Sequence, residues 1–319
     1  MCLRYPQLVE LTVDAPAEAV LLGAVQITLS LEALRRATGL ALPLIVIAFI
    51  GYAAAGHLLP GAFAAQQTSW RVLAGFLAFD ANALPGGPLL IVCNIVISFL
   101  FFGSLLRVTG GAEFFANLAQ VLMGRFRGGP AKVAVAGSAL FGSISGSAVA
   151  NVVATGVVTI PMIRKSGYSA ERAAAVEAVA STGGQLLPPV MGAAAFLMAD
   201  FLRIGYADVV LAALLPGILY YVSLFIQVDL LAGREGYSGL NAEEAGRFRD
   251  IAGGWFFLLP FVALVVALFG FDYYPQTAAL VASLVLVISA LLFSYRGSRP
   301  TFAELAEAVR TTGLVVIDL

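Results

Sequence analysis

The chain has 319 residues, of which 60% are hydrophobic and only 12% are charged, and its mean hydropathy is +0.94. A soluble domain carries roughly 25% charged residues to cover its surface, so this composition excludes a large soluble core and predicts an all-α polytopic membrane protein. The net charge of −1 gives no electrostatic support for a nucleic-acid partner.

Catalytic and metal-binding residue types are sparse. The two cysteines, Cys2 and Cys93, are far apart, and Cys93 lies in an apolar run, so we expect it to be a small buried hydrophobic residue rather than part of a disulfide or metal site. The single histidine, His57, ends an apolar segment near Pro60 and is expected in a loop or at the membrane interface. Because the sequence has no intramembrane histidine, aspartate pair or Cys–His set, we expect no enzymatic activity, no catalytic residues and no cofactor.

Several apolar runs are long enough to cross about 30 Å of hydrocarbon, which takes roughly 20 helical residues. In chain order, spans are predicted at 19–31, which is borderline in length, and at 40–55, 89–106, 209–228, 255–271 and 277–293. Residues 113–123 form a short, fairly apolar segment that is expected to lie along the interface. Residues 301–319 begin one more segment, which is amphipathic at first.

Basic residues predict the topology, because cytoplasmic loops collect Lys and Arg. With the N-terminus outside, 15 of the 18 basic residues lie on the cytoplasmic side, provided that residues 131–160 do not cross the membrane. Basic residues flank this segment on both sides: Arg125, Arg127 and Lys132 near its start, and Arg164 and Lys165 after it. We therefore predict a re-entrant hairpin of two half-membrane helices, at about 131–141 and 148–160, joined by the sequence GSISGS; a single span is the alternative.

A second polar interruption follows in residues 172–201, where the segments 172–183 and 186–201 make one crossing that STGGQLLPP breaks. Gly183 and Gly184 allow backbone conformations that other residues avoid. Pro188 and Pro189 lack N–H groups and leave upstream carbonyls without helical partners. Irregular backbone at membrane depth is tolerated only where protein buries it or where it lines a wet cavity. The two interruptions therefore predict a paired site.

Such breaks expose helix ends, hydroxyls and carbonyls. Helix N-termini attract anionic groups, and freed carbonyls and hydroxyls are hard oxygen ligands for a cation such as Na⁺. Glu177, one helical turn before Ser181, is the nearest acid; it keeps a proton relay open, and its alternative role is that of a helix-face acid near the cytoplasmic boundary. Gly142 and Gly146 also fit close helix packing, so a purely structural role is the alternative to a site.

Two long motifs closely resemble the large membrane subunit of TRAP transporters: FRGGPAKVAVAGSALFGSISGSAVANVVATG and IPMIRKSGYSAERAAAVEAVASTGGQLLPPVMGAAAFLMADF. More narrowly, the chain is similar to the fused small/large (4TM/12TM) permeases associated with TAXI binding proteins. The early ALRRATGLALPLIVIAFIGYAAAGHLLPG resembles the end of the fused small subunit, and YYVSLFIQVDLLAGREGYSGL continues the match. The resemblance implies an ion-transporter-like elevator fold with a re-entrant helical hairpin and a broken helix, of which this chain holds the N-terminal inverted-repeat half.

The resemblance also implies a function and a site. A periplasmic TAXI-type binding protein would deliver a small organic acid, either a C4-dicarboxylate or an amino-acid-like carboxylate, to a multi-pass permease in a bacterial or archaeal cytoplasmic (inner) membrane. Import would occur by Na⁺ symport through an elevator mechanism, with H⁺ as the alternative coupling ion. The implied ion and substrate residues are Ser143, Ser145, Gly146, Ser147, Asn151, Ser181, Thr182, Gly183 and Gly184, with Na⁺ at Ser145, Gly146, Thr182 and Gly183, while Pro188 and Pro189 support the helix break.

The implied domain plan has four parts: residues 1–60 as the end of the fused small-subunit scaffold, 61–130 as scaffold helices with an interfacial arm helix, 131–202 as the transport-domain hairpin and broken helix, and 203–319 as further transmembrane helices. Relative to the family pattern, initial helices and a second inverted half are missing, so a fragment or truncated product is expected, working with the remainder of the fused permease in the lipid bilayer. The alternatives are a non-transporting fragment, a membrane scaffold, or a channel in which the small-residue motifs only pack helices. The sequence specifies neither the particular acid nor the oligomeric state.

Overall fold

The computed structural model describes residues 16–80, 82–295 and 299–317, and every regular element in these ranges is a helix. The chain divides into two compact units, with the boundary between Leu90 and Ile91. Seven of the described helical stretches are long and apolar enough to cross a membrane: Ala17–Thr38, Ala41–Leu58, Leu89–Val108, Ala148–Lys165, Tyr206–Glu235, Phe248–Gly270 and Pro275–Leu292. The prediction of an all-α polytopic membrane protein is therefore confirmed.

Among the residues that the structure describes, the first unit includes the helices α2 (Ala17–Thr38), α3 (Ala41–Ala55) and α4 (Trp70–Phe79), with short 3-10 turns at Gly56–Leu58 and Gly61–Phe63. α2 packs closely on α4, because a Cβ added to Gly23 would lie 2.6 Å from the Ala74 carbonyl oxygen. The sequence analysis did not predict α4, since its ten residues are too few for a span.

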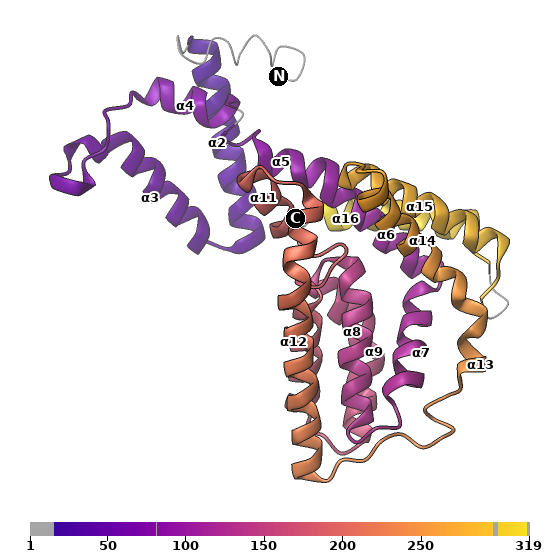
Figure 1. The fold of residues 1–319 in the computed structure, drawn as a ribbon. Coiled ribbons are helices and arrows are strands. Elements are labelled where there is room, and N and C mark those ends of the chain that lie inside the picture. Colours follow the sequence, from indigo (N-terminus) through magenta and orange to yellow (C-terminus); the bar gives the residue numbers. More distant parts are fainter. Residues whose placement is uncertain (1–15, 81, 296–298, 318–319) are drawn as a thin grey trace. The chain divides into compact units, whose positions relative to one another are not determined.

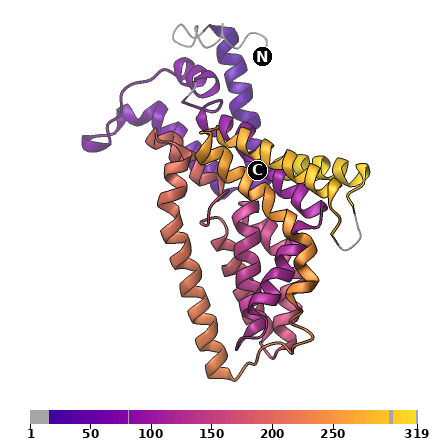
Figure 2. The same ribbon diagram turned by 45° about the vertical axis from the view of Figure 1, so that its right-hand side comes forward.

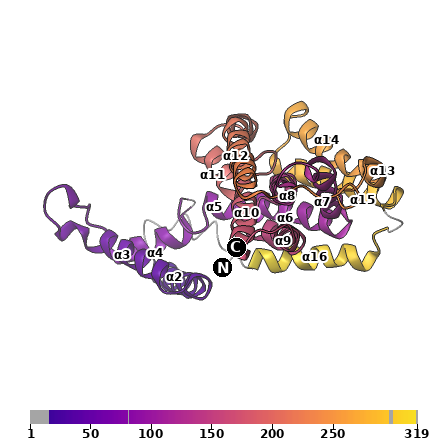
Figure 3. The ribbon, with the colours of Figure 1, turned by 90° about the horizontal axis from the view of Figure 1, so that it is seen from below.

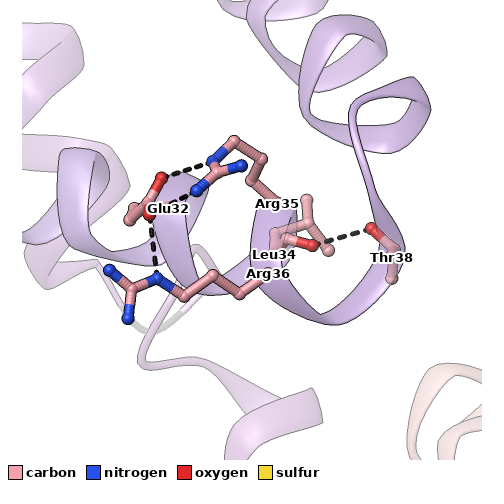
Figure 4. Close-up of polar contacts among 5 residues, drawn as sticks. All are labelled: Glu32, Leu34, Arg35, Arg36 and Thr38. Atoms are coloured by element: carbon pink, nitrogen blue, oxygen red, sulfur yellow. Dashed lines mark hydrogen bonds and ion pairs between the residues drawn. The ribbon is translucent and has the colours of Figure 1, made fainter.

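The last turns of α2 carry a cluster of charged side chains (Figure 4). Glu32 accepts hydrogen bonds from Arg35, at 2.7 and 2.8 Å, and from Arg36, at 2.8 Å. Thr38 Oγ1 donates to the Leu34 carbonyl at 2.8 Å. Because acid–base pairs three and four residues apart stabilise an exposed helix, α2 continues beyond the end of its apolar run, which was the predicted boundary of the span.

The second unit begins within a long helical stretch made of α5 (Gly87–Ile91), a π-helical turn (Val92–Val96) and α6 (Ile97–Val108). α6 packs against α15 (Pro275–Leu292) and α16 (Phe302–Ile317), and α15 packs against α14 (Leu259–Val265). Figures 1 and 2 show these helices lying together across one end of a bundle. The core that they share is rich in aromatic side chains, including Phe99, Phe102, Phe114, Phe115, Phe256 and Phe257.

The bundle itself consists of α7 (Gly111–Met123), α8 (Gly129–Ser145), α9 (Ala148–Lys165), α10 (Ala170–Gly183) and α12 (Tyr206–Glu235), with the short α11 (Ala193–Leu202) packed against α12. Figure 3 looks along these helices and shows α8, α9 and α10 beside one another. Their core is made largely of small side chains, among them Ala131, Ala134, Ala173 and Ala180. Small residues at a helix interface let the backbones approach closely.

A helical stretch between α12 and α15 completes the described fold. It comprises α13 (Phe248–Ile251), a 3-10 segment (Ala252–Leu258), α14 and a π-helical turn (Val266–Gly270). Many large apolar side chains in the second unit face outward; on α12, Leu211, Leu215 and Leu230 are each at least 60% exposed. A soluble surface avoids such rows of leucine, whereas lipid accepts them.

Most predicted spans coincide with observed helices. The segments at 89–106, 209–228 and the borderline 19–31 fall within candidate spans, and those at 40–55, 255–271 and 277–293 each extend one residue beyond one. Residues 113–123 form α7, whose Phe114 and Phe115 are buried in the second unit. His57 is exposed in the 3-10 turn after α3, which agrees with the predicted loop position.

The hairpin arms are longer than predicted. α8 has 17 residues and α9 has 18, in place of the half-membrane helices expected at 131–141 and 148–160. The segment from Gly142 to Ser145 continues α8 because its serines and glycine retain helical hydrogen bonds, so only Gly146 and Ser147 separate the two arms. At 1.5 Å per residue each arm is about 26 Å long, close to the hydrocarbon thickness.

Cys93 is exposed, so the prediction of a buried cysteine is wrong. It lies in the candidate span Leu89–Val108. An apolar run in a membrane protein can face lipid, which is as apolar as a protein core, and hydrophobicity alone therefore does not indicate burial. Cys2 lies outside the described residues.

Candidate functional site

The hairpin tip is a two-residue turn between α8 and α9. Gly146 has a left-handed backbone, with φ of +60°, and its N–H donates to the Gly142 carbonyl at 3.0 Å. A Cβ at Gly146 would lie 2.1 Å from the Met191 carbonyl oxygen, so both backbone conformation and space require glycine. Ser147 caps α9, with its hydroxyl accepting a hydrogen bond from the Ala150 N–H at 3.3 Å. GSISGS is therefore the end of one helix, a tight turn and the cap of the next helix.

The predicted break in the following helix is also present. α10 ends at Gly183 and α11 begins at Ala193. Between them the chain turns back, and the Gly192 N–H donates to the Gln185 carbonyl at 2.9 Å. Tyr206 of α12 shares its hydroxyl proton between the carbonyls of Pro189, at 2.9 Å, and Val190, at 2.6 Å. Carbonyls freed by the break thus find a partner on another helix, as buried backbone requires.

The tip and the break pack directly on each other. The Val190 N–H donates to the Ser143 carbonyl at 3.0 Å. A Cβ added to Gly184 would lie 2.5 Å from the Gly142 Cα, so the two backbones touch at a point where any side chain would collide. The structure therefore brings together the two interruptions that the sequence predicted as a pair.

A cavity of about 150 Å³ lies beside the tip. Its polar lining comes from Ser145, Gly146 and Ser147 at the tip and from Gln185 at the break, and its apolar lining includes Val96, Phe99, Val190, Met191, Phe196 and Val315. Sites that enclose a drug-sized ligand have volumes of roughly 300–1,000 Å³. This cavity suits an ion or a single carboxylate group. The sequence analysis missed Gln185, although it is the one amide side chain within STGGQLLPP.

The other predicted residues direct their polar atoms elsewhere. Ser143 Oγ donates to the Leu140 carbonyl at 3.0 Å, and Thr182 Oγ1 donates to the Ala178 carbonyl at 2.8 Å, so both hydroxyls bond within their own helices. Gly183 lies against Tyr220, since a Cβ there would be 2.3 Å from the ring Cε1. Ser145 and Gly146 of the predicted Na⁺ set therefore line the cavity, while Thr182 and Gly183 are not among its lining residues.

Glu177 is fully buried among α8, α9 and α10 rather than on an outer helix face. Its Oε1 accepts hydrogen bonds from Thr155 at 2.5 Å and from Ser138 and Ser181 at 3.0 Å. Its Oε2 accepts one from Thr159 at 2.5 Å. The sequence analysis singled out the acid but none of the helix α8 and α9 hydroxyls around it, because these lie 18 to 39 positions away in the chain.

Asn151, a predicted site residue, borders this hydroxyl cluster rather than the cavity. It is fully buried, and its Nδ2 donates to the carbonyls of Ser138, at 2.9 Å, and Ser181, at 3.4 Å. Its Oδ1 is buried and has no hydrogen-bond partner among the residues that the structure describes. Asn151 therefore ties the second arm of the hairpin both to the first arm and to the end of α10, next to the break.

The opposite end of the hairpin is held to α12 by charges and rings. Asp229 pairs with Lys132 at 2.5 Å and with Arg127. Tyr168, between α9 and α10, stacks on Tyr237 with ring centroids 3.8 Å apart. Burial, with a smaller contribution from Tyr237, raises the pKa of Tyr168 to about 12. These contacts link the hairpin to the neighbouring helix far from the tip.

The fold and site define a multi-pass α-helical membrane protein in which a helical hairpin abuts a broken helix. A family model for the DctM component of tripartite ATP-independent periplasmic transporters matches residues 25–319. The chain therefore belongs to this family of transporter permeases.

Sequence identity to individual members of the family is modest. Identity is 27% over 80% of the chain and 56% of the sialic acid TRAP transporter large permease protein SiaM of Vibrio cholerae. It is 27% over 86% of the chain and 60% of the ectoine/5-hydroxyectoine large permease protein UehC of Ruegeria pomeroyi. It is 34% over 43% of the chain and 30% of the C4-dicarboxylate large permease protein DctM of Vibrio cholerae. The chain spans about half the length of the curated relatives that it matches.

Proposed function

We propose that this chain is the permease component of a TRAP transporter that imports a small organic acid delivered by a periplasmic binding protein. The observation that carries the proposal is the direct packing of the hairpin tip on the helix break beside a cavity lined by Ser145, Ser147 and Gln185. Membership of the DctM family supports transport as the activity.

The helix ends at the cavity favour an acid together with a cation. Ser147 caps the N-terminus of α9, and Ala193 is the first residue of α11, so two positive helix ends lie at the cavity wall. The Gln185 side chain adds an amide N–H donor for a carboxylate. Ser145 and Gly146 end α8 and supply hydroxyl and carbonyl oxygens, which are hard ligands suited to Na⁺.

The finer parts of the proposal rest on the resemblance of the motifs. The first is Na⁺ symport, driven by an elevator movement of residues 131–202 against a scaffold that includes residues 1–130. The second is that the periplasmic binding protein is of the TAXI type. The third is that the permease lies in the inner membrane of a bacterium or archaeon. Relatives are named for sialic acid, C4-dicarboxylates and ectoine. Because these names differ, we propose only the class of substrate here, namely a small organic acid of the C4-dicarboxylate or amino-acid-like kind.

The test is uptake by proteoliposomes that contain the permease to which this chain belongs, together with its binding protein. We expect labelled organic acid to accumulate when a Na⁺ gradient points inward, and to accumulate poorly when choline replaces Na⁺ or when the binding protein is omitted. Uptake that depends on neither component would refute the mechanism.

Close packing of Gly142 on Gly184 is also what a purely structural motif would show, so a scaffold role is the second candidate. The two functions differ in the expected effect of Ser145→Ala, which removes one hydroxyl from the cavity and leaves the glycine contact intact. A transport site predicts at least a tenfold loss of uptake in a folded protein, whereas a scaffold predicts none.

A further inference from the structure

We propose that the first unit binds one phospholipid with an anionic headgroup, whose acyl chain lies in a groove among α2, α3 and α4 and whose phosphate contacts Arg35. The groove has a volume of about 330 Å³, and all its lining residues belong to this unit. Seven of its eight lining residues are aliphatic, and Ser30 is the eighth. Because such a lining offers few hydrogen bonds, the part of an occupant that it buries has to be apolar.

The groove runs along the helices. From α2 it is lined by Ile27, Leu31 and Leu34, which share one face because residues three and four apart lie on the same side of a helix. Val46 and Ile50, also four apart, line it from α3. The distance along α2 from Leu34 to Ile27 is about 10 Å at 1.5 Å per residue. The hydrocarbon of one bilayer leaflet is about 15 Å thick, so the groove follows an acyl chain through most of one leaflet.

A cluster with excess positive charge lies at the end of the groove (Figure 4). Arg35 is four residues after Leu31, so it lies one helical turn beyond the groove lining. Its Nε and Nη2 donate to Glu32 at 2.7 and 2.8 Å, and the Arg36 Nε donates to the same carboxylate at 2.8 Å. The Arg35 Nη1 makes no hydrogen bond among the described residues. Two positive charges and one negative charge leave the cluster with a net charge of +1.

The charge of the cluster matches a phosphate group. A guanidinium carries five N–H donors in a planar fork that suits phosphate oxygens, and Glu32 uses two of those of Arg35. Both Glu32 oxygens already accept hydrogen bonds, so the cluster has little to offer the ammonium group of a zwitterionic headgroup. The predicted topology puts this end of α2 on the cytoplasmic side, where anionic lipids attract basic residues. The cluster therefore favours an anionic headgroup.

The size of the groove favours a lipid over another helix. A helix with its side chains is about 10 Å across, so a 10 Å length of it occupies roughly 800 Å³. The groove provides about 330 Å³. An acyl chain is narrower and flexible, and it is as apolar as the leucines that line the groove. The groove and Arg35 together therefore specify a single bound lipid, distinct from the lipid that surrounds the exposed helix faces.

Binding is tested by native mass spectrometry of the purified chain in detergent. The chain is titrated with phosphatidylglycerol or with phosphatidylcholine that has the same acyl chains. We expect one phosphatidylglycerol to bind saturably, about fivefold more tightly than phosphatidylcholine, because that is the contribution of one basic residue beside anionic lipid. Glycerol 3-phosphate, which has the phosphate without the acyl chains, should not compete.

Two variants test the two halves of the site, each with a matched control. Arg35→Gln should lower the affinity for phosphatidylglycerol about fivefold and leave that for phosphatidylcholine unchanged. Arg71→Gln, which removes an exposed arginine of the same unit, should bind both lipids as the unaltered chain does. Val46→Trp fills the groove and should lower the affinity for both lipids roughly tenfold. Ile47→Trp, at an exposed position of the same helix that does not line the groove, should have no effect.

If Val46→Trp does not fold, Ile50→Phe adds a smaller volume to the same wall and should lower the affinity for both lipids about threefold. The proposal is overturned if the unaltered chain binds the two lipids equally, if Arg35→Gln keeps the preference, or if a folded groove-filling variant retains both lipids. A dimer of the unaltered chain that Val46→Trp dissociates would also overturn it, since a second copy would then occupy the groove. None of these outcomes depends on whether an organic acid is carried.

Discussion

Replacing Gly146 by alanine tests how the hairpin tip is built. Two costs combine at this position. The left-handed backbone, with φ of +60°, costs a residue with a Cβ about 1 kcal/mol. The added Cβ would also lie 2.1 Å from the Met191 carbonyl oxygen, and relieving such an overlap in packed backbone costs roughly 1–3 kcal/mol. We expect Gly146→Ala to destabilise the chain by roughly 2–4 kcal/mol.

The matched control is Gly236→Ala. Gly236 caps α12 with φ of +77°, and a Cβ there meets nothing within 4 Å, so this variant has the backbone cost of about 1 kcal/mol without the overlap. Thermal unfolding followed by circular dichroism in detergent should separate the two variants by about 2–12 °C, at roughly 2–4 °C per kcal/mol. Equal unfolding midpoints for the two variants would refute the contact between the tip and the break.

Three further predictions concern the surroundings of the site. Tyr206→Phe removes the hydroxyl that donates to the Pro189 and Val190 carbonyls and should lower the free energy of unfolding by about 1–3 kcal/mol. Amide hydrogen exchange in residues 184–192 should become faster. The control Tyr274→Phe, at an exposed position, should leave this exchange rate unchanged. Burial raises the pKa of Tyr168 in the folded chain to about 12, against about 10 in the unfolded chain, so its stabilising contribution should be present below pH 10 and be lost as the pH rises toward 12. Between pH 9 and 11.5, the free energy of unfolding should fall more steeply with pH for the unaltered chain than for Tyr168→Phe. Parallel curves for the two proteins would contradict this assignment. Lys132→Met removes one of the two cations that pair with Asp229 and should destabilise the join between the hairpin and α12, measured as a lower unfolding midpoint than in Arg36→Met, whose side chain lies on the exposed end of α2.

Hydrophobic length and glycine placement made much of the fold predictable. The spans at 40–55 and 277–293 follow from the number of apolar residues needed to cross a bilayer, which is a local property of the sequence. The hairpin followed from basic residues at both ends of 131–160, and the break followed from Gly183, Gly184, Pro188 and Pro189, whose backbone limits do not depend on their neighbours. Short packed elements such as α4 lack such a signal.

The sequence-based predictions were wrong where a residue type is stable in more than one structural environment. Gly142 and Ser143 were predicted to begin a polar turn, yet α8 continues to Ser145 and its last turn is closed by the Gly146 N–H, which donates to the Gly142 carbonyl. Cys93 was predicted to be buried because its neighbours in the sequence are apolar, but a membrane helix can point such a side chain toward lipid.

The amino-acid sequence by itself determined that this chain is an α-helical membrane protein with two polar interruptions, since composition and the backbone limits of glycine and proline act locally. Only the tertiary structure decided what those interruptions touch. It placed Gly142 on Gly184 and turned Gln185 to the cavity. It also gathered hydroxyls from three helices around Glu177, because which residues meet in space depends on how the helices pack and not on their order in the chain.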